Sequence, residues 1–334
     1  MRARAALLVG ALLMGAADTV PAPRFGRSVL TGADPSMLAV DGRFWLYPTG
    51  EGNRLDAWTS TDLSAWTRRA TLLKLGGVNW ARGADKHYLW APHMTAAAGR
   101  YYLYYSVGPQ EPQPSRIGVA TCDTPAGPCR DSGKPLLDGA DAITFPGRPA
   151  ATCPDATPPS GHGRYHFEAI DPMVFVDAKS GHALLYAGGS NGSTLRVFEL
   201  APDMVSIARE LPVDQPPCFT EGVWMHQRRG IYYLSYSSGR YDNASYSVRY
   251  AVSLSPTGPW RYGGVLLHSD RAYKGPGHHA FLQDPRTGEW LIAYHRWEHE
   301  LGNGPYHDQR KVALAHVHYR ADGAIEPIDM EAER

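Results

Sequence analysis

One two-strand motif recurs five times along the chain, and this repetition limits the possible folds more than any other feature. The five copies occupy residues 33–50, 90–108, 170–189, 221–239 and 277–296. Each copy is an apolar segment, a turn ending in glycine and a second segment rich in aromatic residues, which is the pattern of a β-hairpin. A β-sandwich gives no reason for one hairpin to recur in the same register, so the pattern favours an array of similar small sheets.

Further strand-like segments follow most of the hairpins, and amphipathic helical periodicity is hard to find. Examples are VATCDTPAGP from Val119 and AVSLSPTGPW from Ala251, and short segments such as RATLLKL and GGVLLH complete the units. Such units repeat at intervals of about fifty to eighty residues and predict an all-β, five-bladed β-propeller of four-stranded antiparallel blades. The segment at 138–165, rich in Gly and Pro, is predicted to be a loop on the rim.

The N-terminus has the layout of an export signal. Arg2 and Arg4 precede an apolar run over residues 5–17, and small residues follow. The run is too short to span a bilayer. We therefore predict a signal peptide over residues 1–22, a single propeller domain over residues 23–334, and a secreted or periplasmic protein.

Four cysteines are expected to form two disulfides in an exported protein, with three possible pairings. They are Cys122, Cys129, Cys153 and Cys218. The short spacing from Cys122 to Cys129 encloses a Thr-Pro-Ala-Gly-Pro turn and favours a local bridge. No second close pair of cysteines or histidines accompanies it, so zinc binding by these cysteines is not expected.

Charge and aromatic content point to a neutral substrate. Lys plus Arg and Asp plus Glu each total 33, without a long block of one sign, which argues against a nucleic-acid partner. The 19 Tyr and 9 Trp residues offer flat surfaces for stacking on sugar rings, although we expect most of them to pack inside the sheets.

Three carboxylates stand at the starts of three motif copies. In a propeller the first strand of each blade lines the central channel, so Asp34, Asp171 and Glu221 are predicted to converge at one end of the axis. An Asp-Pro pair is also a common turn opener, but its recurrence in two copies favours a site. Clustered buried carboxylates are costly and usually serve catalysis or metal binding. Glycoside hydrolysis needs one carboxyl group to protonate the leaving oxygen and another to activate water.

The motifs ADPSML, YLWAPHM, IDPMVF, TEGVWM and GPGHHAF, in this order, resemble those of glycoside hydrolase family 43 over residues 32–328. The resemblance implies an inverting mechanism with Asp34 as general base, Glu221 as general acid and Asp171 controlling the pKa and orientation of the acid. The sequence departs from the family pattern at Val223, where proline usually follows the acid motif. The chain also stops soon after the fifth motif, without the β-sandwich of two-domain relatives, which weakens a xylosidase interpretation of that type.

The resemblance also implies a histidine on the propeller axis, often beside a calcium ion held mainly through water. We expect His279 to face the channel as the metal ligand and His278 to lie beside it at the substrate, because adjacent strand residues alternate faces. Calcium prefers oxygen ligands, so a site built on one imidazole would be weak or rich in water. No cofactor is expected to be required, and calcium would have a structural role.

Four more residues are candidates for sugar binding. The resemblance implies that Arg296 binds hydroxyl groups of the innermost sugar, with an ion pair at the surface as the alternative. Trp90 and Trp224 neighbour the carboxylate motifs and could stack on a sugar. His93 stands where relatives often have an acidic residue or histidine, near the acid.

Together these features predict an exo-acting α-L-arabinofuranosidase that acts as a monomer on arabinan or arabinose-decorated xylan, without membrane contact after signal cleavage. β-Xylosidase, endo-arabinanase and exo-galactanase activities stay open, because rim loops set specificity. A non-catalytic carbohydrate-binding propeller is the alternative from another class, but it would need neither an acid nor a base.

Overall fold

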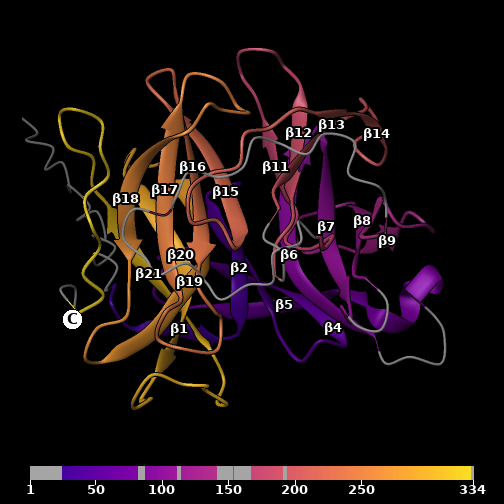
Figure 1. Cartoon of the computed structure of the whole chain (residues 1–334). Helices are drawn as coiled ribbons and strands as arrows, with labels where there is room; N and C mark the ends of the chain where they lie inside the picture. Colours follow the sequence, from indigo (N-terminus) through magenta and orange to yellow (C-terminus); the bar gives the residue numbers. More distant parts are fainter. Residues whose placement is uncertain are drawn as a thin grey trace, which may run out of the picture.

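The computed structural model describes residues 25–81, 87–110, 114–140, 153, 167–190 and 194–331. It contains five antiparallel sheets whose innermost strands contact one another in a closed ring (Figure 1). The predicted all-β, five-bladed propeller is therefore confirmed. No helix in these ranges is long and apolar enough to cross a membrane. The predicted signal peptide at 1–22 lies outside the described residues, as does most of the predicted loop at 138–165.

Four blades follow one another along the chain, each numbered outward from the axis. The first has β2 (Ala33–Val40), β3 (Arg43–Thr49), β4 (Arg54–Ser60) and β5 (Thr67–Lys74), followed by the short 3₁₀ turns η1 (Leu75–Gly77) and η2 (Asn79–Ala81). The second has β6 (Tyr88–Ala97), β7 (Arg100–Gly108), β8 (Arg116–Cys122) and β10 (Leu137–Asp138), with the additional strand β9 (Cys129–Asp131) beside β8. The third has β11 (Met173–Val176), β12 (Ala183–Ala187), β13 (Arg196–Leu200) and β14 (Ile207–Leu211). The fourth has β15 (Glu221–Arg228), β16 (Ile231–Ser238), β17 (Ser247–Ser253) and β18 (Arg261–Leu267).

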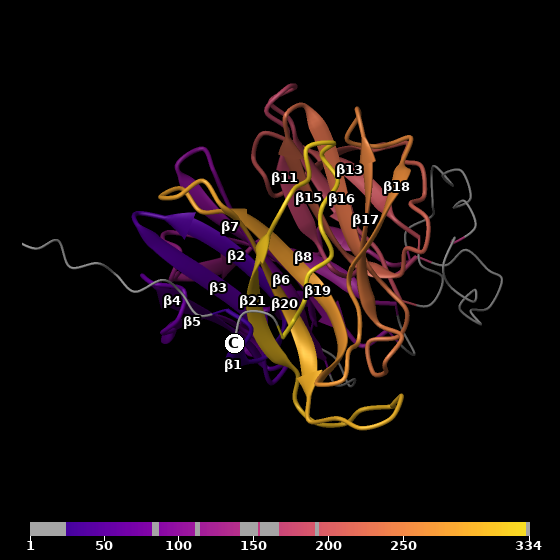
Figure 2. The same ribbon diagram turned by 90° about the vertical axis from the view of Figure 1, so that its left-hand side faces the viewer.

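The fifth blade joins both ends of the described chain. It contains β19 (Tyr273–Gln283), β20 (Trp290–Glu298) and β21 (Lys311–Val317), and its outer strand is β1 (Ser28–Thr31) from the N-terminal end (Figure 2). β1 pairs antiparallel with β21. No sequence pattern marks this closure, because β1 has four residues and lies outside the repeated motif. The pairing completes the fifth sheet and ties the N-terminal segment to the last blade of the ring.

Three inner hairpins have two-residue turns in which both residues have positive φ. These are Asp41-Gly42, Ala98-Gly99 and Arg229-Gly230. Such turns match the right-handed twist of the flanking strands, and glycine takes the second position at no steric cost. The glycines predicted to end these hairpin turns are confirmed in that role.

Each blade has a left-handed residue at an equivalent point of its innermost segment, within the strand in four blades and two residues before β11 in the third. The five residues are Asp34, Ala91, Asp171, Gly222 and His278, with φ of 48°, 44°, 56°, 60° and 28°. In four sheets the strand register shifts here, which marks a β-bulge. Bulges re-aim side chains next to active sites, and a left-handed non-glycine residue costs about 1–3 kcal/mol. The repeated strain indicates that these positions serve a site.

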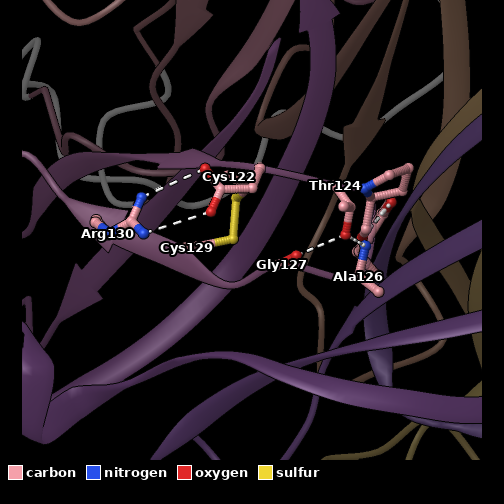
Figure 3. The surroundings of a disulfide bond; sticks show 9 residues. Cys122, Thr124, Ala126, Gly127, Cys129 and Arg130 are labelled. Carbon is pink, nitrogen blue, oxygen red and sulfur yellow. Dashed lines mark hydrogen bonds and ion pairs between the residues drawn. A yellow bond between two sulfur atoms is a disulfide. The ribbon is translucent and has the colours of Figure 1, made fainter.

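Two disulfides connect the four cysteines. Cys122–Cys129 joins β8 to β9 beside the hydrogen-bonded turn around Thr124 and Gly127 (Figure 3). Cys153–Cys218 closes a sequence separation of 65 residues and ends just before β15. The predicted local bridge is confirmed, and the second pairing resolves the alternatives that the sequence left open.

Candidate active site

The structure brings the three predicted carboxylates to one mouth of the propeller. His278 links two of them, since its Nδ1 lies 3.4 Å from Asp34 Oδ1 and 3.4 Å from Asp171 Oδ2. Asp171 Oδ2 also accepts the backbone N–H of Gly222, the residue after Glu221, at 3.0 Å. Residues from four blades therefore meet in one cluster, as the motif positions predict.

Side chains of neighbouring blades hold the bulges in place. Three hydroxyl groups near the ends of second strands accept the N–H of the left-handed residue in the next blade: Thr49 Oγ1 from Ala91 at 2.7 Å, Ser106 Oγ from Asp171 at 2.9 Å, and Ser237 Oγ from His278 at 2.8 Å. In the fifth blade, His295 Nδ1 accepts the N–H of Asp34 at 3.1 Å. A fixed backbone at each bulge fixes the direction of the side chain that leaves it.

The third blade has glycine where the first, second and fourth have these hydroxyl groups. That glycine is Gly188, whose N–H donates to the Ile170 carbonyl at 3.0 Å. At the next residue, Gly189, an added Cβ atom would lie 2.5 Å from Cβ of Glu221, so Glu221 occupies the space that a side chain would need. With no hydroxyl group at this point, the N–H of Gly222 donates instead to Asp171. This substitution places Asp171 next to Glu221.

Asp34 lies among basic groups. Its Oδ1 is 3.3 Å from Arg310 Nη1 and 3.3 Å from His295 Nδ1. Burial by itself raises the pKa of Asp34, but the charge of Arg310 and the contacts with His278 and His295 outweigh burial and hold the pKa well below its usual value. Asp34 is therefore a carboxylate at neutral pH and is suited to accept a proton.

Glu221 and Asp171 lie in the opposite electrostatic setting. Burial raises the pKa of Glu221, and the charge of Asp34 raises it further, against hydrogen bonds that favour the ionised form. Burial and the charges of Glu221 and Asp34 raise the pKa of Asp171. Two close, buried carboxyl groups cannot both ionise readily, so the pair retains a proton to higher pH than isolated carboxyl groups would. One member can then act as a proton donor.

Two hydroxyl groups that no sequence pattern marks also contact Glu221. Tyr246 donates to Oε1 at 2.7 Å and Ser190 donates to Oε2 at 3.3 Å. Gln110 Nε2 in turn donates to Ser190 Oγ at 2.8 Å. These residues follow or precede the hairpin motifs, and no local pattern marks them, so only their spatial proximity to Glu221 reveals them.

The prediction that Arg296 binds sugar is wrong in this geometry. Its side chain is 0% exposed and donates to Glu298 Oε1 at 2.8 Å and to the Gly26 carbonyl at 2.9 Å. The alternative of a surface ion pair is wrong too, because the pair with Glu298 is buried on the arginine side. Arg310, which the sequence analysis did not single out, is the arginine beside the carboxylates and retains 21% side-chain exposure.

Of the two adjacent histidines, His278 lies at the carboxylates and His279 is buried in the blade. His278 faces the carboxylates, whereas His279 is 1% exposed and its Nε2 lies 2.6 Å from Ser235 Oγ. The bulge between Gly277 and His279 shifts the strand alternation by one residue and turns His278 toward the mouth.

The calcium ion expected at His279 stays a prediction. Nδ1 of His279 is buried without a hydrogen-bond partner, and the edge of the ring meets Phe281. No cluster of three or more metal-binding side chains occurs in the described ranges. One imidazole and one hydroxyl group do not match the oxygen-rich shell that Ca²⁺ prefers. The reaction steps proposed below use neither a calcium ion nor His279.

The remaining predicted sugar-binding residues lie at two depths. His93 and Trp224 are 4% and 9% exposed, contact each other, and line an axial cavity of about 490 Å³ that none of the three carboxylates lines. They therefore lie below the mouth, and direct stacking of Trp224 on a sugar at the carboxylates does not fit. Trp90 is half-buried next to the bulge at Ala91 and stacks on Tyr88, with ring centroids 6.0 Å apart.

Comparison with known proteins matches this chain to a family model and to individual relatives. The sequence model of glycosyl hydrolases family 43 matches residues 26–146 and 156–325. A β-D-galactofuranosidase of Aspergillus niger is 30% identical over 95% of this chain and 88% of its own length. A xylosidase/arabinosidase of Humicola insolens is 28% identical over 88% of this chain and 95% of its own length.

A solved structure of a relative has a similar fold. The α-L-arabinofuranosidase of Clostridium thermocellum superposes with a TM-score of 0.64 and 27% identity, covering 88% of this chain and 92% of that one. The family model spans most of the sequence, and the motifs it covers are those that build the carboxylate cluster. The chain therefore belongs to glycosyl hydrolases family 43 and is a glycoside hydrolase.

Proposed function

We propose that the protein is an inverting, exo-acting α-L-arabinofuranosidase that releases terminal arabinofuranose from arabinan or arabinose-decorated xylan. The observation that carries the proposal is the meeting of Asp34, Asp171 and Glu221 in one cluster, where the pKa of Asp34 is lowered and that of Glu221 is raised. When the environment lowers the pKa of one carboxyl group and raises that of another, the first is suited to act as the base and the second as the acid.

In the proposed reaction Asp34 takes a proton from water, and the water oxygen bonds to the anomeric carbon. The bond from this carbon to the glycosidic oxygen breaks, its electron pair stays on the leaving oxygen, and Glu221 donates a proton to that oxygen. The products are a sugar of inverted anomeric configuration and an alcohol. Asp171, held by the N–H of Gly222 next to Glu221, orients the acid and shares a proton with it, while the charge of Asp34 helps to keep the pKa of Glu221 raised.

Two other sugars have support from the relatives. The A. niger relative is named for β-D-galactofuranose, which shares the five-membered ring of arabinofuranose. The H. insolens relative is named for both xylose and arabinose, so it supports a β-xylosidase equally. We expect arabinofuranoside to be the preferred substrate, with galactofuranoside and xyloside as the alternatives that an assay must separate.

The test measures release of 4-nitrophenol from α-L-arabinofuranoside, β-D-galactofuranoside and β-D-xylopyranoside reporters, and the anomer formed first by NMR. We expect the highest kcat/KM on the arabinofuranoside and inversion of configuration. Turnover confined to a different reporter would reassign the sugar, and retention would contradict the inverting mechanism. Binding of arabino-oligosaccharide without any turnover would favour the non-catalytic propeller.

Replacement of the acid gives a sharper test. Glu221→Gln keeps the shape of the side chain but cannot donate the proton, so kcat on arabino-oligosaccharides should fall by about 10²–10⁴-fold. Glu326→Gln, at an exposed position in the last described segment, is the matched control and should retain wild-type kcat. Equal activity of the two variants would remove Glu221 from the mechanism.

We further propose that the enzyme acts outside the cytoplasm. The sequence of residues 1–22 supports this, and so do the two disulfides, because such bonds persist mainly in oxidising compartments. Fractionation of cells producing the full chain would test it.

A further inference from the structure

Tyr246 is a buried tyrosine in contact with the proposed acid, and its ring packs against two paired residues of the fifth blade. It is 1% exposed and lies just before β17. At Gly277 an added Cβ atom would overlap the ring, so the glycine makes room for it. The ring also stacks in parallel on His295, with centroids 5.7 Å apart and an interplanar angle of 8°. This packing holds the hydroxyl group of Tyr246 at 2.7 Å from Oε1 of Glu221.

A directional chain of hydrogen bonds leads to this hydroxyl group. It begins at the backbone N–H of His278, which can only donate, and which donates to Ser237 Oγ at 2.8 Å. Ser237 therefore has its own proton left to donate, and Ser237 acts to lower the otherwise raised pKa of Tyr246, as a donor near the phenolic oxygen does. The hydroxyl group of Tyr246 has one proton, which it donates to Oε1 of Glu221.

This direction distinguishes the two oxygens of the carboxyl group. Oε1 accepts from Tyr246 at 2.7 Å, so a proton on Oε1 would compete with the donated one. Oε2 also accepts, from Ser190 Oγ, but over the longer distance of 3.3 Å, so a proton on Oε2 displaces the weaker of the two hydrogen bonds. We propose that Tyr246 is a positioning residue that keeps Oε1 of Glu221 as an acceptor and thereby places the transferable proton of the acid on Oε2. This inference rests on the proposed role of Glu221 as general acid.

The hydrogen bond from Tyr246 to Glu221 affects how the activity depends on pH. The titratable and charged groups around Glu221 are Asp34, Asp171, Arg310 and Tyr246, with His278 and His295 packed beside them. Burial raises the pKa of Glu221, whereas the hydrogen bond from Tyr246 lowers it by stabilising the ionised form. The acid must be protonated to act, so activity is lost as pH rises through this pKa. Removing the hydroxyl group should therefore move the basic limb of the pH profile to higher pH.

Tyr246→Phe removes the hydroxyl group and keeps the ring. We expect kcat on arabino-oligosaccharides to fall by roughly tenfold to a hundredfold, part of the effect of a complete general acid. The loss should be much smaller on an aryl glycoside with a good leaving group, which needs little protonation. The basic limb of kcat/KM should shift upward in the same variant.

Tyr186→Phe is the matched control. Tyr186 is also fully buried, and its hydroxyl group donates to a backbone carbonyl, that of Pro256, at 2.8 Å. The control loses one buried hydrogen bond without touching Glu221, so it should lose stability but keep the wild-type pH profile and leaving-group dependence. An equal shift in both variants would overturn the proposal, because the effect would then be structural.

Ser237→Ala covers the case in which Tyr246→Phe does not fold, as judged by circular dichroism. It removes the donor that orients Tyr246 and should shift the basic limb in the same direction by a smaller amount. An unshifted limb in a folded variant of either kind would contradict the inference while leaving the proposed function intact. A wild-type protein inactive on every reporter would instead contradict the proposed function.

Discussion

At the scale of single residues, Asp34 and Asp171 show how environment separates two chemically identical groups. Each precedes a proline, each is left-handed, and each starts an innermost segment of its blade. Arg310 and two histidines surround Asp34, and they lower its pKa in spite of burial. Asp171 faces Glu221 and Asp34 instead, and its pKa is raised. Their different roles follow from what packs against them.

Arg310→Gln tests this reasoning. Loss of the positive charge should raise the pKa of Asp34, because burial then acts with less opposition. A general base works only when deprotonated, so activity is lost as pH falls through its pKa, and the acidic limb of kcat/KM should move to higher pH. Arg320→Gln, at an exposed position, is the control. A higher KM with an unmoved acidic limb would show that Arg310 acts on substrate alone.

At the scale of elements, the left-handed residue in the innermost segment of each blade is the device that aims side chains at the mouth, and in four blades it lies in a β-bulge. In three blades the N–H of the left-handed residue is bound by a hydroxyl group of the preceding blade. The third blade has Gly188 in place of the hydroxyl residue, and the next residue, Gly189, leaves room for Glu221. A small local change in one repeat thus creates the pairing of Glu221 with Asp171.

Gly189→Ala should therefore reduce kcat, because the added methyl group meets Cβ of Glu221 at 2.5 Å and the acid must move. A displacement of about 1 Å at a catalytic group can cost on the order of a hundredfold. Gly50→Ala, where an added Cβ meets nothing within 4 Å, is the matched control. Steady-state kinetics and thermal unfolding separate the outcomes: wild-type kcat in folded Gly189→Ala would show that Glu221 adapts.

At the scale of the whole molecule, the ring depends on its closure. β1 completes the last sheet, and Arg296 binds the segment that precedes β1 through the Gly26 carbonyl. The same guanidinium group pairs with Glu298 and stacks on the ring of Tyr273. Arg296 thus ties the first described residues to the fifth blade.

Arg296→Met should lower the free energy of unfolding by about 3 kcal/mol, since breaking a buried ion pair leaves Glu298 without its partner. The denaturation midpoint in urea would measure it. Arg320→Met breaks an exposed pair with Asp322 and should cost less than about 1 kcal/mol. Equal midpoints for the two variants would show that Arg296 does not stabilise the closure.

Much of the fold and the core of the site could be predicted because their signals are local. A strand, a two-residue turn and the next strand lie within one motif, and five copies in one register indicate five blades. Asp34, Asp171 and Glu221 occupy comparable places in these copies, so the repeat alone predicts that they meet. The turn glycines and the bridge Cys122–Cys129 are local in the same way.

The sequence by itself thus determined the repeated hairpins and, through them, the propeller and the convergence of three carboxylates. The tertiary structure decided which groups surround them: Arg310 rather than Arg296, His278 rather than His279, and Tyr246 at the acid. These contacts depend on a one-residue bulge and on the rotation of one blade against the next. Neither leaves a local pattern, because each contact joins segments that only the closed ring brings together.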